Sequence, residues 1–208
     1  DARRSMNTFL GSSETLSVDQ LDHEAIAASE YLYIEGYQVT SPTGREAAIK
    51  AREIAEAAGV KTALSFSDPG MVEFFRDGLE QMVGDKLDLV FANEDEAKGW
   101  AKVDTVEDAI EGLKQVANTF AITLGADGAV AWDGSELHRI PPHKVHAVDT
   151  NGAGDMFAGA FLYAITRGED FPTAGRFASL AAGKVVANYG PRLSAPDYTA
   201  LRAEFFGD

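Results

Sequence analysis

A carboxylate directly follows a glycine-rich turn in the C-terminal part of the sequence. Residues 148–168 read VDTNGAGDMFAGAFLYAITRG, so a strand end runs through the turn into an apolar helix of small residues. The free amides of Gly152, Ala153, Gly154 and Asp155 can converge there on an anion such as a phosphoryl group. A carboxylate at this place suits a general base that accepts the proton of an attacking hydroxyl. The simpler interpretation is a tight turn in which Asp155 only caps the helix.

The elements that must position this turn alternate between short apolar runs and segments with helical spacing. Strands are expected at residues 31–36, 61–66, 87–92 and 119–125. Helices are expected at residues 41–58 and 71–83, as two stretches within 94–117, and at 153–166, 173–188 and 197–206. This order indicates an α/β protein with a parallel sheet covered on both faces. The Asp133-Gly134 turn within residues 128–140 predicts a hairpin at one sheet edge.

Three motifs together resemble those of one enzyme family. DTNGAGD, residues 149–155, is similar to the C-terminal signature of the ribokinase-type carbohydrate and nucleoside kinases, the PfkB family. NEDE, residues 93–96, is similar to the family's N-x-x-E motif, and TLGADG, residues 123–128, resembles its T-x-G-x-x-G motif. The resemblance implies a three-layer α/β/α ribokinase-like fold with a mostly parallel central sheet. Residues 1–208 would be the nucleotide-binding α/β domain of an ATP-dependent kinase, with Asp155 as its base.

The resemblance also implies roles for the other two motifs. In that family the N-x-x-E motif holds Mg²⁺ and its waters beside the nucleotide phosphates, and Asn93 with Glu96 offers the oxygen ligands that Mg²⁺ prefers. The same two residues form a good helix-capping box, and both roles can coexist. Thr123, Gly125 and Gly128 would lie along the nucleotide, although a plain turn explains these glycines equally well.

Other positions match the family more loosely. Arg4 corresponds to an arginine that reaches the phosphates, with Arg3 as an alternative and a surface arginine without a role as another. Ser179 falls where relatives place a residue near the adenine, but a small helix-packing residue is an equally good interpretation. Many relatives hold a monovalent cation such as K⁺ with residues that correspond to Asp149, Asn151, Gly190 and Ser194.

The resemblance begins well inside a typical family member. The first strands of the sheet, a small β-sheet lid and a Gly-Gly-Asn type motif that grips the acceptor have no counterpart here, and the chain starts without Met. We therefore expect a longer protein, and a homodimer through the absent lid, as is common among relatives. Asn151, the N-terminal DARRSMNTFLG and the EGY segment at residues 35–37 favour an adenosine-kinase-like enzyme acting on a ribonucleoside. A sugar kinase of the fructokinase or ribokinase branch is the alternative.

The composition narrows the function classes. Lys and Arg number 18 against 33 Asp and Glu, and the formal net charge of −15 disfavours binding to nucleic acid or to an anionic membrane. The absence of cysteine excludes disulfides and thiolate zinc sites, and a cytoplasmic location is expected. His138, His143 and His146 lie around a Pro-Pro turn without a carboxylate at ligand spacing, so they predict no metal site.

Two other classes of protein stay open. A nucleotide-binding module that has lost catalysis would have no need of Asp155. A doubly wound domain that binds a dinucleotide would carry an early G-x-G-x-x-G after its first strand, and none is present.

Overall fold

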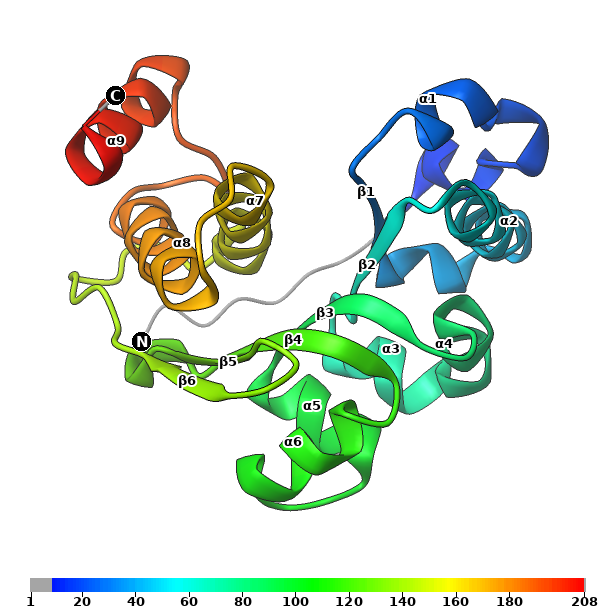
Figure 1. Cartoon of the computed structure of the whole chain (residues 1–208), viewed down its shortest axis with the longest axis horizontal. Coiled ribbons are helices and arrows are strands. Elements are labelled where there is room, and N and C mark those ends of the chain that lie inside the picture. Colours follow the sequence, from blue (N-terminus) through cyan, green and yellow to red (C-terminus); the bar gives the residue numbers. More distant parts are fainter. Residues whose placement is uncertain (1–8, 208) are drawn as a thin grey trace. The chain divides into compact units, whose positions relative to one another are not determined.

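The computed structural model describes residues 9–207, which form an α/β arrangement of strands and connecting helices (Figure 1). Within residues 9–207, six strands are hydrogen-bonded in the order in which they occur in the chain. They are β1 (Tyr31–Glu35), β2 (Lys61–Ser65), β3 (Leu87–Asn93), β4 (Ala117–Thr123), β5 (Ala129–Trp132) and β6 (Leu137–Ile140). The α/β class and the terminal hairpin β5–β6 that the sequence predicted are thereby confirmed.

The chain divides into two compact units. The N-terminal unit comprises residues 9–122 and Trp132–Glu136, and the C-terminal unit comprises Thr123–Ala131 and residues 137–207. Within the described range 9–207, no helix has both the length and the apolar character needed to cross a membrane.

The N-terminal unit is built on parallel strands whose carboxyl ends share one edge. Glu35 of β1 pairs in register with Ser65 of β2, and Ser65 pairs with Phe91 of β3. Helices connect these strands, and α2, α4, α5 and α6 lie on the same side of them in Figure 1, as right-handed crossovers require. The helical elements of this unit are η1 (Gly11–Thr15), η2 (Val18–Gln20), α1 (His23–Ala27), η3 (Gly36–Thr40), α2 (Pro42–Ala58), α3 (Pro69–Phe74), α4 (Arg76–Val83), α5 (Glu94–Ala101) and α6 (Val106–Leu113).

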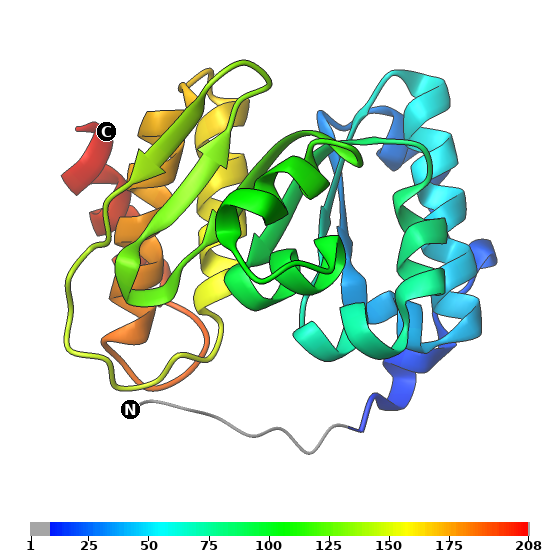
Figure 2. The ribbon, with the colours of Figure 1, turned by 90° about the horizontal axis from the view of Figure 1, so that it is seen from below.

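The C-terminal unit packs a pair of helices against the hairpin. It contains η4 (Gly125–Asp127), α7 (Ala153–Thr166), α8 (Phe171–Val186) and α9 (Ala195–Phe206). Helices α7 and α8 lie side by side, yellow and orange in Figure 2, and α8 also contacts β6. Buried alanines on both helices, such as Ala164 and Ala178, allow this close approach. Aromatic contacts then join α9 to the pair, with the Phe177 and Phe206 ring centroids 4.7 Å apart.

Several element bounds differ from the predicted ones, and three of the differences have a visible physical reason. Residues 71–83 were predicted as one helix but form α3 and α4, with a break at Phe75 that lets Gly78 approach Val39 closely. The second helical stretch of 94–117 ends at Leu113, because the chain turns there into β4. Helix α8 begins two residues before the predicted start, since the Asp170 side chain accepts a hydrogen bond from the Thr173 amide.

Candidate active site

The turn before α7 has the backbone geometry of an anion-binding site. Gly152 is the N-cap of α7 with φ of +75°, and a Cβ there would overlap the backbone of Pro191, so only glycine fits. At Gly154 an added Cβ would meet nothing within 4 Å, which leaves the first turn of the helix open. Asp155 is the third helical residue and its side chain is exposed. Because the first amides of a helix have no intrahelical acceptor, an anion bound here would lie beside the Asp155 carboxylate.

Asp149 fixes the backbone that enters this turn. Its Oδ1 accepts a hydrogen bond of 2.9 Å from the Asn151 amide, and its Oδ2 accepts one of 3.0 Å from the Gly190 amide. The amides of Val148 and Asp149 both donate to the carbonyl of Val186, at 2.9 and 3.2 Å. The turn is therefore tied to the end of α8 and to the loop that follows it.

The Asn93–Glu96 motif forms the capping box expected from the sequence. Asn93 ends β3 and caps α5, where its Oδ1 accepts from the Glu96 amide at 2.9 Å. In return, the Glu96 carboxylate accepts from the Asn93 amide at 2.9 Å and from Asn93 Nδ2 at 2.6 Å. Glu96 is only 4% exposed, so its charge is held in a fixed place. In the part of the chain that is described, no three His, Asp or Glu side chains cluster as metal ligands.

A single buried carboxylate with an amide suits Mg²⁺, because this ion keeps most of its water ligands and takes few from the protein. The residues present therefore fit the Mg²⁺ role that the resemblance implied, alongside their role as a helix cap.

The two glycines of the TLGADG motif differ in their surroundings. Gly125, with φ of +58°, has open space where a Cβ would be. Gly128, with φ of +91°, is pressed against the backbone of Ile140 and Pro142, and its carbonyl accepts from the Leu124 amide at 2.8 Å. Gly125 can therefore expose its backbone to a ligand, whereas packing of the hairpin already explains Gly128. Thr123 is the last residue of β4.

Ser179 anchors the loop that leads to the Gly152 turn. Its Oγ accepts from the His143 amide at 3.0 Å and donates to the Pro141 carbonyl at 3.0 Å. Gly183, one helical turn further along α8, has no room for a Cβ because the His143 side chain lies 2.9 Å from that position. The Ser179 side chain thus does more than fill space in α8, because it also holds the loop at Pro141 and His143.

The four candidate cation ligands are only partly brought together. Asp149, Asn151 and Gly190 are joined by the hydrogen bonds described above. Ser194 instead caps α9, where its hydroxyl donates to the Asp197 carboxylate at 2.5 Å. Arg3 and Arg4, the candidates for phosphate contact, lie outside the described residues.

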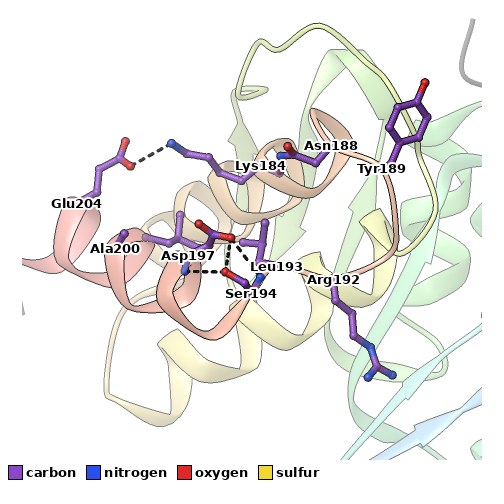
Figure 3. Close-up of a pocket in the computed structure, with 10 residues that line it drawn as sticks. Lys184, Asn188, Tyr189, Arg192, Leu193, Ser194, Asp197, Ala200 and Glu204 are labelled. Carbon is purple, nitrogen blue, oxygen red and sulfur yellow. Dashed lines mark hydrogen bonds and ion pairs between the residues drawn. The ribbon is translucent and has the colours of Figure 1, made fainter.

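A hollow between the ends of α8 and α9, which the sequence did not reveal, lies beside Ser194 (Figure 3). It has a volume of about 410 Å³. Lys184 of α8 pairs with Glu204 of α9 at 3.2 Å across it, and Asp197 accepts the hydrogen bonds that cap α9. Tyr189 and Arg192 point away from these groups in Figure 3. The charges that line the hollow are thus largely engaged with one another.

The chain is an α/β protein whose C-terminal unit has a glycine turn at a helix N-terminus followed by an exposed carboxylate, and whose N-terminal unit has a buried Asn–Glu box at the end of a parallel strand. Comparison with known proteins gives the family. The pfkB family carbohydrate kinases match residues 1–198, and the chain belongs to this family. The family resemblance seen in the sequence is therefore confirmed.

Individual relatives include both nucleoside and sugar kinases. An adenosine kinase of Schizophyllum commune is 31% identical over 222 residues, covering 95% of this chain and 63% of that protein. The crystal structure of adenosine kinase from Sinorhizobium meliloti matches with a TM-score of 0.93 and 33% identity over 98% of this chain and 63% of that one. A probable sugar kinase from Rhizobium etli CFN 42 matches with a TM-score of 0.91 and 33% identity, over 99% of this chain and 63% of that one. The ribokinase-like fold is confirmed, and the chain spans less than two thirds of each of these relatives.

Proposed function

We propose that the protein is an ATP-dependent kinase that transfers the γ-phosphoryl group to a hydroxyl of a ribonucleoside or sugar. The observation that carries the proposal is the placement of Asp155. Its carboxylate is exposed on the first turn of α7, directly behind a Gly152 turn that admits no side chain. Gly152 at the N-cap offers no side chain, and Asp155 at the third helical position stays exposed.

In the proposed reaction, Asp155 accepts the proton of the acceptor hydroxyl as its oxygen attacks the γ-phosphorus. The bond from that phosphorus to the bridging oxygen breaks, and ADP leaves. The amides of the turn at Gly152 stabilise the negative charge on the transferring group, with the dipole of α7 in support. Asn93 and Glu96 would hold Mg²⁺, which neutralises charge on the phosphates. Catalysis is then positioning and electrostatics, without a covalent enzyme intermediate.

The nucleotide is proposed to use Thr123, the open backbone at Gly125 and the loop that Ser179 anchors. Gly128 would contribute indirectly, by shaping the turn that follows β4. A K⁺ ion at Asp149, Asn151, Gly190 and Ser194, and a phosphate contact of Arg4, stay predictions.

For the acceptor we favour a ribonucleoside, because two of the three relatives described above are named as adenosine kinases. The probable sugar kinase from Rhizobium etli CFN 42 is equally similar in identity, and it keeps a sugar acceptor as the second candidate.

The test is an assay of ADP formation by the intact protein that carries this sequence, with a panel of nucleosides and sugars. We expect acceptor-dependent turnover, and Asp155→Asn should lower it by about 10²-fold or more while ATP affinity stays near normal. Asp197→Asn, which changes an exposed carboxylate in the cap of α9, is the matched control and should keep turnover. ATP binding without turnover on any acceptor would replace the kinase with a nucleotide-binding module.

A further inference from the structure

Ser67 occupies a strained turn just beyond the carboxyl end of β2. Its φ is +70°, and among residues 9–207 the other non-glycine residue with positive φ is Lys102, which ends α5. The amide of Asp68 donates to the carbonyl of Phe66 at 2.8 Å across Ser67. A hydrogen bond from a backbone amide to the carbonyl two residues earlier, across a central residue of positive φ, defines the rare and strained form of the γ-turn. A serine keeps this conformation only where its surroundings hold it.

Hydrogen bonds hold Ser67 in place, and the partner farthest from it in the sequence is Glu35, at the end of β1. Ser67 Oγ lies 3.0 Å from Glu35 Oε2 and donates to it, and the Ser67 amide donates to Ser65 Oγ at 3.1 Å. Next to Glu35, a Cβ on Gly36 would lie 2.6 Å from the Ser65 carbonyl oxygen and 2.7 Å from that of Phe66. The end of β1 is therefore pressed directly onto the turn.

The turn is joined to the Asn93–Glu96 box through Phe66. The Phe66 amide donates to the Phe91 carbonyl at 3.1 Å, two residues before Asn93. The Phe66 side chain is fully buried and stacks on Trp100 of α5, with ring centroids 4.7 Å apart. Phe66 thus contacts the chain on both sides of the Asn93–Glu96 box in the sequence. It contacts Phe91 in β3 before the box and Trp100 in α5 after it.

We infer that Glu35 is a positioning residue, which holds the Phe66–Asp68 turn through Ser67 and thereby sets the place of Asn93 and Glu96. All of these residues belong to the N-terminal unit and lie at or just beyond the carboxyl ends of the parallel strands β1, β2 and β3. The inference rests on the proposed function for one point, the binding of Mg²⁺ by the box. The hydrogen bonds and the aromatic stack stand independently of it.

The test compares Glu35→Ala, Ser67→Gly and the double variant in the intact protein. The quantity measured is the Mg²⁺ concentration that gives half-maximal ATP binding by calorimetry. Glu35→Ala should raise it by about 10-fold, as loss of a residue that orients metal ligands commonly does. Glycine adopts φ of +70° without support, so Glu35→Ala should have little further effect once Ser67 is glycine.

Lys102→Gly is the matched control, because it removes the other positive-φ side chain of the same unit and should leave the Mg²⁺ requirement unchanged. An equal effect of Glu35→Ala in both backgrounds would show that Glu35 acts by another route. A lower melting temperature with an unchanged Mg²⁺ requirement would reduce Glu35 to a structural residue. Either result overturns the inference.

A second readout needs no nucleotide. In Glu35→Ala the backbone amide resonances of Asn93 and Glu96 should shift in the ¹⁵N–¹H spectrum, and unchanged resonances would overturn the inference. If the wild-type protein binds no MgATP, the proposed function is contradicted. The amide resonances would still test whether Glu35 affects the position of Asn93.

Discussion

The side chain of Asp149 and the backbone of Gly190 are joined by a hydrogen bond of 3.0 Å, although 41 residues separate them in the chain. The second carboxylate oxygen of Asp149 accepts from the Asn151 amide at 2.9 Å. Bonds of backbone amides to an ionised carboxylate are stronger than bonds between neutral groups. One side chain therefore fixes both the backbone entering the Gly152 turn and the loop after α8.

Asp149→Asn should destabilise the protein by about 1–3 kcal/mol, because its amide group can accept only one of the two hydrogen bonds and leaves a donor facing the other amide. The free energy of unfolding in urea measures this change. Asp197→Asn, in the exposed cap of α9, is the comparison. A loss for Asp149→Asn no greater than for Asp197→Asn would show that the bond to Gly190 adds no particular stability.

Gly152→Ala and Gly154→Ala should act in opposite directions. Gly152 has φ of +75° and no room for a Cβ beside Pro191, so alanine should cost about 2 kcal/mol or more. Gly154 is helical and open, and alanine there should stabilise the helix by about 0.5–1 kcal/mol. The denaturant concentration at the midpoint of unfolding, measured for both variants, tests these two changes in stability. Equal changes would mean that the turn does not rest against Pro191 as described.

The N-cap of α8 should weaken in acid. The Thr173 side chain and then the Thr173 amide, through their hydrogen bonds, lower the pKa of Asp170 below its ordinary value. A lowered pKa means that the ionised group favours the folded state, so its contribution is complete above the ordinary pKa and is lost as pH falls through the lowered one. The effect is small because Asp170 is exposed. Urea midpoints measured downward from neutral pH should show less acid sensitivity in Asp170→Asn, whose side chain also caps helices. Identical pH profiles would contradict this account.

The elements that local pattern determines were predictable from sequence. Helix α7 begins at Ala153 and ends at Thr166 as predicted, because a glycine turn starts it and its small apolar residues continue without a break. The capping box at Asn93 was likewise visible as a spacing of three residues. In both cases the partners lie within one turn of each other in the sequence.

Features that depend on distant partners were not predictable. The break at Phe75 accompanies the close approach of Gly78 to Val39, and the space at Gly128 is limited by the backbone of Ile140 in the hairpin. Ser67 carries no sequence signal for positive φ, because its supporting bond to Glu35 spans 32 residues. Tertiary packing, which local propensity does not encode, determines each of these.

Glu96→Gln separates the two roles of the Asn93–Glu96 box. Glutamine keeps one side-chain oxygen to accept from the Asn93 amide, now 2.9 Å from Glu96 Oε2, so most of the cap should survive. Its charge is lost, however, and the affinity for MgATP should fall by about 10-fold or more, with partial recovery in excess Mg²⁺. Calorimetric titrations at two Mg²⁺ concentrations, with thermal unfolding in parallel, measure both effects. Asp95→Asn removes an exposed charge from the same helical turn and should leave the affinity unchanged. A fall in melting temperature without any Mg²⁺-dependent loss of affinity would leave Glu96 with its capping role alone, since a ligand that orients the ion must respond to its concentration.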